Sequence, residues 1–246
     1  MDERRLVGRV VPVVDLSRRV VDEMFAVHAR LYDGVSEREF RSDLAEKDWV
    51  LLLRDERDGE IRGFTTLMLL DVEVAGEPLR AVFSGDTAID PRFWGGQALV
   101  QTWARFVGEL RGEAAGRRVF WFLISKGYRT YLYLPLFFHA FYPRAGVATP
   151  AFERTLIHAL ATQKYPGAFN PDTGVIEHAH DRLKPSLAVV SDHRRQHPHV
   201  ALFLERNPGY AEGHELVCIA EISPANMKGL ARRMLLEGSG ALAVGL

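Results

Sequence analysis

The sequence predicts an α/β (α+β) fold in which a mixed, mostly antiparallel central sheet is flanked by helices. The first observation is a hairpin, because two apolar segments at 49–54 and 61–70 flank a polar turn that ends in Asp-Gly. A second turn at 75–78 returns the chain into a strand at 79–89. The second observation is that a helical pattern and another apolar strand follow. Strands that follow one another directly are expected to pair antiparallel, whereas two strands joined by a helix are expected to run parallel. Together they predict a mixed sheet.

The N-terminal elements precede this hairpin. Residues 6–14 are typical of a strand, and Pro12 predicts that it lies at the edge of the sheet, because proline cannot donate a ladder hydrogen bond. A helix with an apolar side is expected over 18–32, capped by Asp15 or Ser17.

A second helix is expected over 36–45, because the serine and glutamate at its start have the spacing of a capping box. His28 lies on or beside the apolar side of the first helix. We interpret it as a structural histidine in preference to a catalytic one.

A pair of glycines stands between the strand at 79–89 and the helix that follows it. Gly95 and Gly96 precede a segment at 98–110 whose apolar residues recur at helical spacing. The next segment, 118–124, is apolar without alternation, as expected for a strand covered on both faces. Glycines at such a junction let a ligand's phosphates approach the backbone, where the helix N-terminus favours an anion.

The last hundred residues carry further elements of both kinds. The expected elements are helices at 153–164, 197–206 and 224–236, and strands at 185–190 and 215–222. We find no linker and no internal repeat. The sequence therefore predicts one domain over 1–246, with a core at about 1–145 and a C-terminal elaboration at about 146–246 whose final strand rejoins the sheet.

Composition excludes several classes of function. The 246 residues carry a formal net charge of −1, which gives no electrostatic argument for binding nucleic acid or a membrane surface. Cys218 is the single cysteine, so neither an internal disulfide nor a cysteine-based zinc site is expected. The start lacks a secretory apolar segment, and no apolar run approaches the length of a membrane span. A cytoplasmic protein is therefore expected.

The turn before the helix at 98–110 has a recognisable pattern. Ile89-Asp90-Pro91 ends the strand, and Arg92-Phe93-Trp94-Gly95 follows it. This turn and the order of elements resemble the core of the GNAT (Gcn5-related) N-acyltransferase superfamily over about 20–144. The family's turn reads Arg or Gln, two residues, Gly, one residue, then Gly or Ala. Gln97 stands here at the second small position.

The resemblance implies an acyl-CoA-dependent N-acyltransferase with acetyl-CoA or a longer acyl-CoA as co-substrate. A small-molecule or peptide amine would attack the thioester directly, between the strands at 79–89 and 118–124. Asp86 is expected as the base and Tyr131 as the acid that protonates the leaving thiolate, with Tyr128 and Tyr133 also available. The residues expected to hold the coenzyme are Ile89, Arg92, Phe93, Trp94, Gly95, Gly96, Gln97, Ala98 and Ser125.

Two alternatives stay open. One is an acyltransferase that takes its acyl group from an acyl-carrier protein or uses a long acyl chain. The aromatic residues of 128–142 would line a pocket for that chain, although a packed core is the favoured interpretation of them. The other is a noncatalytic GNAT-like protein that binds a ligand or a partner. Gln97 favours it, and so does Phe137, which stands near the place of the family's usual tyrosine.

The nine histidines raise the question of a metal site. The candidate clusters are His178, His180 and Asp181, and the histidines of 193–199. Neither cluster has the His-Glu-x-x-His spacing, and loop histidines in solvent are the favoured interpretation. No metal is therefore expected. A serine hydrolase is excluded because its Gly-x-Ser-x-Gly motif is absent from the sequence.

Overall fold

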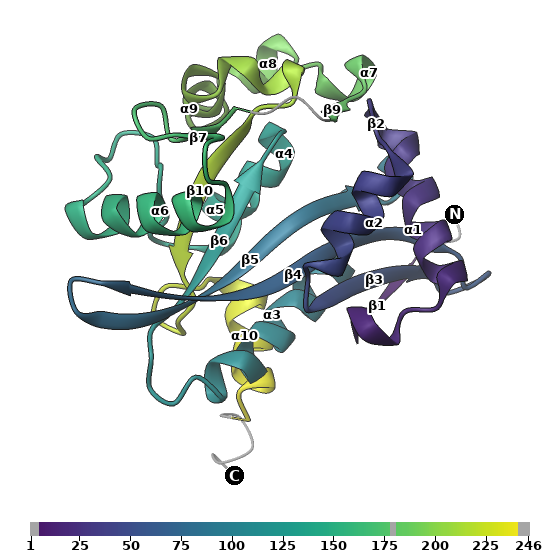
Figure 1. The fold of residues 1–246 in the computed structure, drawn as a ribbon, viewed down its shortest axis with the longest axis horizontal. Helices are drawn as coiled ribbons and strands as arrows, with labels where there is room; N and C mark the ends of the chain where they lie inside the picture. The colour runs from purple at the N-terminus through teal and green to yellow at the C-terminus, as the bar shows by residue number, and fades with distance from the viewer. Residues whose placement is uncertain (1–4, 178–180, 241–246) are drawn as a thin grey trace.

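The computed structural model describes residues 5–177 and 181–240. In this part of the chain, eight strands form one sheet in the order β1-β3-β4-β5-β6-β10-β8-β7 (Figure 1). Only β5 and β6 run parallel, and the other neighbouring strands are antiparallel. The predicted fold class, a mixed and mostly antiparallel sheet flanked by helices, is confirmed.

The N-terminal elements form as the sequence predicts. β1 (Leu6–Pro12) is the edge strand and leads through η1 (Val13–Asp15) to α1 (Arg18–Leu31). After β2 (Tyr32–Asp33), the short helix α2 (Glu37–Ala45) follows. Ser17 and Ser36 cap the two α-helices, because each hydroxyl accepts a hydrogen bond from a backbone N–H three residues later.

The middle of the sheet is the predicted meander. β3 (Trp49–Asp55), β4 (Ile61–Val74) and β5 (Glu77–Ile89) pair in sequence order, and the β4–β5 hairpin extends past the rest of the sheet at the left of Figure 1. Thr65 pairs with Thr87 and Leu67 with Ser84, so that two residues of β5 oppose one residue of β4. This β-bulge falls at Gly85 and Asp86.

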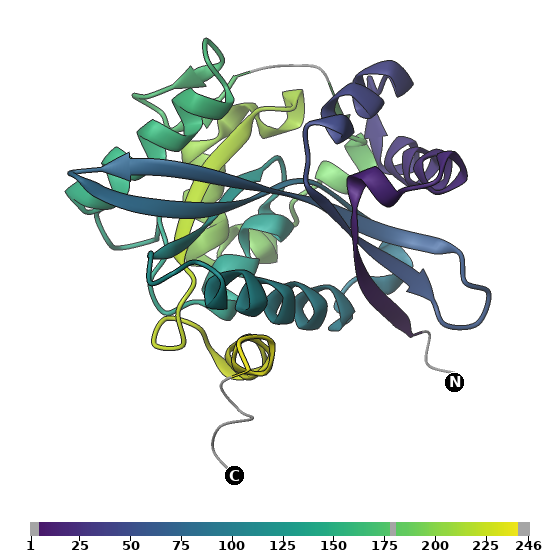
Figure 2. The same ribbon diagram turned by 60° about the horizontal axis from the view of Figure 1, so that its bottom comes forward.

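β6 is buried on both faces, as its unbroken apolar sequence predicts. The chain passes from β5 through η2 (Pro91–Phe93) and α3 (Ala98–Gly112) into β6 (Val119–Ser125). Trp121 and Leu123 pack in the cluster that contains α3, while Phe120 and Phe122 pack in the cluster that contains α6. Figure 2 shows α3 and α10 on one side of the sheet and α1, α2 and α6 on the other.

The C-terminal part completes the sheet and covers it. β10 (Glu215–Glu221) pairs with β6, as predicted for the final strand. The remaining elements are α4 (Tyr128–Tyr131), α5 (Tyr133–Phe137), α6 (Ala151–Lys164), β7 (Phe169–Asn170), β8 (Val175–Ile176), β9 (Arg182–Leu183), α7 (Pro185–Ala188), α8 (Asp192–Arg195), α9 (Pro198–Arg206), η3 (Pro208–Glu212) and α10 (Gly229–Gly238). β9 pairs with β2, which brings this part of the chain back over the N-terminal helices.

Two predictions for this part were wrong. Residues 185–190 form the short helix α7 instead of a strand, because Pro185 takes the first helical position and the carbonyl of Lys184 accepts hydrogen bonds from Leu187 and Ala188. The last helix starts at Gly229 and not at 224, because Asn226 is held in a turn by its amide bonds to Ala140 and Glu221. Among the described residues, no helix has the length and apolar character needed to cross a membrane.

Candidate functional site

β5 and β6 separate in the middle of the sheet. Their parallel ladder runs from Arg80 and Val119 to Ser84 and Leu123 and then stops. Beyond this point β5 stays with β4, whereas β6 stays with β10. The bulge at Gly85 starts the separation, and a side chain there would collide with its surroundings because an added Cβ would lie 2.7 Å from Thr66 Oγ1. A cavity opens where the strands diverge.

The first cavity, of about 420 Å³, runs from this separation to the turn before α3. Phe93, Trp94, Gly95 and Gly96 line one side of it, and α4 lines another. The first hydrogen bond of α3 runs from the Gln101 N–H to the Gln97 carbonyl, so the N–H groups of its first turn have no partner within the helix. The cavity wall ends at Gly96, directly before this helix terminus, whose positive dipole favours an anion nearby.

Three cations line the same cavity, namely Lys126, Arg129 and Arg194. The Arg129 guanidinium lies 4.5 Å from the centre of the Trp94 ring and donates a 2.6 Å hydrogen bond to the Tyr128 hydroxyl. Trp94 is itself held by a 2.9 Å hydrogen bond from its Nε1 to the Ile89 carbonyl. Arg129 was not predicted as a site residue; it lies in α4, four residues after the end of β6.

The residues predicted to hold a coenzyme fall into two groups. Those that line the first cavity are Ile89, Phe93, Trp94, Gly95 and Gly96. Arg92 is exposed, and its guanidinium pairs with Asp90 instead of reaching the cavity wall.

Gln97 precedes α3 without a side-chain cap, and Ala98 is the first residue of the helix. Ser125 is buried and donates a 2.8 Å hydrogen bond to the Gly127 carbonyl. The residues that do not line the first cavity are therefore Arg92, Gln97, Ala98 and Ser125.

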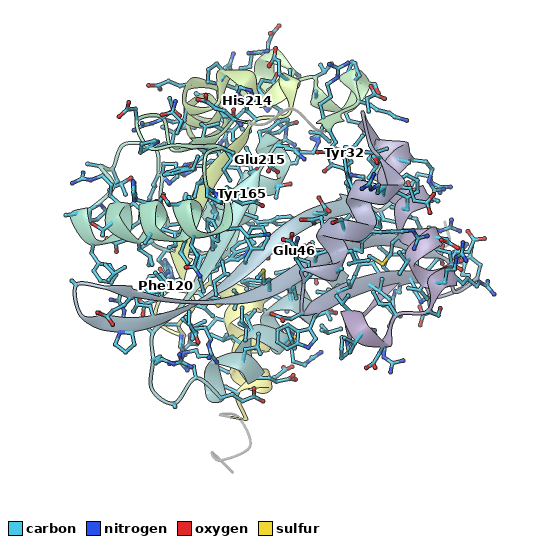
Figure 3. The ribbon with its side chains drawn as sticks, viewed as in Figure 1. Tyr32, Glu46, Phe120, Tyr165, His214 and Glu215 are labelled. Carbon is cyan, nitrogen blue, oxygen red and sulfur yellow. The ribbon has the colours of Figure 1, made fainter. Side chains whose placement is uncertain are left out.

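A second cavity, of about 490 Å³, lies on the other side of the separated strands. Residues of α2, the end of α6 and Asp181 line it. The two cavities share part of their walls, and the shared residues are Gly85, Asp86, Ile124, Lys126 and Glu215. Figure 3 shows Tyr32 and Glu215 facing each other from the N-terminal and C-terminal parts of the chain, with Glu46 and Tyr165 below them. Two molecules could therefore approach Asp86 from opposite sides.

The Asp86 carboxylate is unpaired within residues 5–177 and 181–240. It makes no hydrogen bond or ion pair with any residue that the structure describes, and it is part of both cavity walls. Burial raises its pKa above the ordinary value of 3.8; the charges of His28 and Lys126 oppose this rise, and those of Asp43 and Asp181 add to it. A carboxylate with a raised pKa and no partner can accept a proton from a ligand.

A buried network of charges lies beside Asp86. The Lys126 ammonium contacts the Asp181 carboxylate and lies 3.7 Å from Glu215, and His28 Nε2 lies 3.2 Å from Asp181 Oδ2. Burial opposes ionisation of Asp181, but the hydrogen bond to His28 and the charge of Lys126 hold its pKa well below the usual range. Burial likewise opposes the charge of Lys126, and the carboxylates of Glu215 and Asp181 keep its pKa above the usual range.

Sequence reasoning missed most of this network. Its members come from α1, the end of β6, the segment before β9 and the start of β10, and no local spacing connects them. His28 was predicted to be structural. The structure does bury it, with 4% of its surface exposed, but it also places the ring in the wall of the second cavity, stacked at 4.4 Å on Tyr32.

The three tyrosines that follow β6 have different surroundings. Tyr131 is fully buried, donates a 2.8 Å hydrogen bond to the Pro143 carbonyl and lies outside the walls of both cavities. Tyr128 and Tyr133 line the first cavity. Tyr133 also borders a small cavity beside Ser84, where the β5–β6 ladder ends, and burial raises its pKa, so it keeps its proton. The structure thus places Tyr133, and not Tyr131, beside the separated strands.

The predicted histidine clusters give no metal site in the described part of the chain. His178 and His180 lie outside the described residues. Within 5–177 and 181–240, no group of three or more histidine, cysteine, aspartate or glutamate side chains is arranged to hold a metal ion.

The strand order, the separation of two parallel strands and the turn before α3 belong to the mixed, mostly antiparallel sheet flanked by helices that the sequence predicts. No protein-family model matches the chain, and no curated protein matches it. Among solved structures, it is similar to a GNAT family N-acetyltransferase from Escherichia coli in complex with CoA, at 20% identity and a TM-score of 0.37, over 56% of this chain and 71% of that one.

Two further solved structures resemble the chain. One is a conserved protein of unknown function from Enterococcus faecalis V583, described as a probable N-acyltransferase, with 15% identity and a TM-score of 0.40 over 55% of this chain. This chain spans only 33% of the length of that protein. The other is BH1408 from Bacillus halodurans, at 16% identity and a TM-score of 0.40, over 58% of this chain and 97% of that one. The function proposed below rests on the geometry of the site.

Proposed function

We propose that this protein is an N-acyltransferase that moves an acyl group from acyl-CoA to an amine. The observation that carries the proposal is that two cavities meet at Asp86, whose carboxylate has no partner among the described residues. Direct transfer needs a donor and an acceptor on opposite sides of one proton-accepting group. The arrangement around the separated strands meets this requirement.

The first cavity has the chemistry that a coenzyme A thioester requires. Its far end lies at Gly95 and Gly96, directly before the N-terminus of α3, and the Arg129 guanidinium there would bind phosphates. Gly95 has a φ of +87°, which strains any other residue. Its near end lies where the β5–β6 ladder has stopped, so that backbone groups of the two strands are released from pairing with each other. A thioester placed there would supply the electrophilic carbonyl.

The residues of the shared wall then have separate roles. Asp86 takes the proton from the incoming ammonium of the acceptor, which frees the nitrogen lone pair to attack the thioester carbonyl. The new C–N bond forms as the C–S bond breaks, and Tyr133 donates its hydroxyl proton to the leaving thiolate. The nitrogen then loses its second proton, which restores the Tyr133 hydroxyl. Lys126 stays paired with Asp181 and Glu215 and holds the strand ends in position. Tyr131 has no part in this scheme, because its hydroxyl bonds to Pro143 outside the cavities.

Thermal-shift measurements with coenzyme A, acetyl-CoA and acyl-CoAs of increasing length test the donor site. A ligand present at 100 times its Kd should stabilise the folded state by about 2.7 kcal/mol. A shift that grows with chain length would support a longer acyl donor. If no thioester shifts the melting temperature, the donor would have to be an acyl-carrier protein, or the protein would be a noncatalytic member of this fold.

Transfer itself is followed by the release of free coenzyme A thiol in the presence of candidate amines. The protein contributes no competing thiol to this assay, because its single cysteine, Cys218, is fully buried and burial raises its pKa well above the usual value. Stabilisation by acetyl-CoA without thiol release for any amine would contradict the proposed activity.

A further inference from the structure

The wall of the second cavity carries more carboxylates than amines. Among the described residues its carboxylates are Glu39, Asp43, Glu46, Asp86, Asp181 and Glu215, and its lysines are Lys47, Lys126 and Lys164. Each lysine is already paired, because Lys47 lies 2.6 Å from Asp43, Lys164 lies 2.5 Å from Glu46, and Lys126 contacts Asp181. Six carboxylates against three lysines leave an excess of three negative charges.

These carboxylates lie at two depths. Glu39, Asp43 and Glu46 are spaced by four and three residues, which places them on one face of α2. Glu39 and Glu46 are exposed, and 43% of the Asp43 side chain is exposed. Asp181 is half-buried and Glu215 is buried, with 15% and 9% of their side chains exposed. Figure 3 shows Glu46 and Glu215 on different sides of the region between α2 and β10. The cavity therefore has an acidic mouth on α2 and an acidic inner end at Asp86.

His28 provides an independent sign that a polar ligand binds in this cavity. Its ring lines the cavity and is 4% exposed. The Asp181 carboxylate can only accept, so Nε2 donates the 3.2 Å hydrogen bond. Nδ1 is buried and has no hydrogen-bond partner among the described residues. A buried ring nitrogen without a partner favours a ligand that can hydrogen-bond to it, and an amine nitrogen can do so.

We propose that the acceptor is a small aliphatic amine that carries at least two cationic groups. One ammonium lies at the inner end, near His28, and gives its proton to Asp86. The second cation lies at the mouth and is held by Glu39, Asp43 and Glu46. A carboxylate or phosphate on the acceptor would be repelled by the same wall. This inference rests on the proposed function, because it takes the second cavity as the acceptor site.

Three amines of equal chain length test it, with acetyl-CoA as donor. Butylamine has one charge, 1,4-diaminobutane has two, and 4-aminobutanoate replaces the second ammonium by a carboxylate. We expect kcat/KM to be on the order of tenfold higher for the diamine than for butylamine, and lowest for 4-aminobutanoate. Raising the salt from about 0.05 M to about 0.5 M should reduce the preference, because exposed charges are screened.

Glu39→Gln locates the second cation. Glu39 is exposed and its side chain has no partner among the described residues, so the substitution should not disturb the fold. We expect KM for 1,4-diaminobutane to rise by roughly 3-fold to 5-fold with kcat unchanged, and KM for butylamine to stay the same. The matched control is Glu37→Gln in the same helix, because Glu37 pairs with Arg41 and lies outside the cavity wall. It should leave both amines unaffected.

The outcomes separate this inference from the proposed function. Equal kcat/KM for butylamine and 1,4-diaminobutane would overturn the inference and leave the acyltransferase intact. Preference for a lysine-containing peptide over the diamine would also overturn it. If no amine is acylated, the proposed function fails. Calorimetric titration of the protein with the two amines then tests the inference independently of catalysis. Binding of 1,4-diaminobutane no tighter than that of butylamine would then refute it.

Discussion

Asp86→Asn should abolish most of the activity and at the same time stabilise the protein. The substitution keeps the size of the side chain but removes its charge and its ability to accept a proton. General base catalysis contributes about 10²-fold to 10⁴-fold, so we expect kcat to fall by that factor, with little change in KM for either substrate.

The stability effect follows from the direction of the pKa shift. Burial raises the pKa of Asp86 in the folded state above 3.8, so the folded protein binds this proton more tightly than the unfolded chain does. Below the unfolded pKa, Asp86 is protonated in both the folded and the unfolded state, so its ionisation does not lower the free energy of unfolding. The destabilisation develops as the pH rises above 3.8, and it is complete only above the folded pKa. Asparagine removes it.

The size of the stability effect depends on pH. Asp86 faces two cavities, so its carboxylate is not sealed in an apolar core. We expect Asp86→Asn to have a higher free energy of unfolding and a higher Tm than the wild type at pH 7, and the difference between the two proteins to shrink at pH 3.

The assay combines melting curves at pH 3 and pH 7 with kcat/KM as a function of pH. The wild-type rate should rise with pH as Asp86 loses its proton, and the variant should lack this limb of the profile. Asp90→Asn is the matched control, because Asp90 follows the same strand but pairs with Arg92, whose hydrogen bond lowers the Asp90 pKa. It should leave kcat unchanged and slightly lower the stability. Asp86→Asn with turnover within about 3-fold of wild type would refute the assignment.

Three further predictions concern the walls of the two cavities. Gly96→Glu should abolish the thermal shift with coenzyme A, because its side chain starts 3.2 Å from the Phe93 carbonyl and puts a negative charge at the phosphate end. Tyr133→Phe should lower kcat by at least about tenfold and leave KM unchanged. Tyr131→Phe should leave kcat unchanged. It should lower the free energy of unfolding, measured by urea denaturation, by about 1 kcal/mol, because the hydrogen bond to Pro143 is lost. Lys126→Met should cost about 3–5 kcal/mol by the same measurement, because it removes the cation that lies between the Asp181 and Glu215 carboxylates, whereas Lys164→Met should cost less than about 1 kcal/mol because its partner is exposed.

Each of these predictions has an outcome that contradicts it. Coenzyme A binding retained by Gly96→Glu would move the phosphate site away from the start of α3. Loss of kcat in Tyr131→Phe with full activity in Tyr133→Phe would restore Tyr131 as the acid. A Lys126→Met protein as stable as wild type would show that the buried carboxylates take up protons or solvent without cost.

Local physical chemistry was enough to predict most of the elements. Ser17 and Ser36 cap the two N-terminal helices as their spacing indicates, and Pro12 lies in an edge strand. β6 is buried on both faces, as its unbroken apolar run predicts. The prediction failed at 185–190, where an apolar segment without a strand partner took the helix that Pro185 starts.

The sequence by itself determined the order of the longer elements from β1 to β6 and the turn that ends at Gly96, because capping, turn formation and burial of a strand depend on near neighbours in the chain. Only the tertiary structure decided which groups meet Asp86. Lys126, Asp181, Glu215 and His28 come from four separate segments, and the charge that each carries depends on partners distant in sequence. Such contacts leave no periodic pattern in the sequence. They depend on the pairing of β10 with β6 in the sheet and on the pairing of β9 with β2.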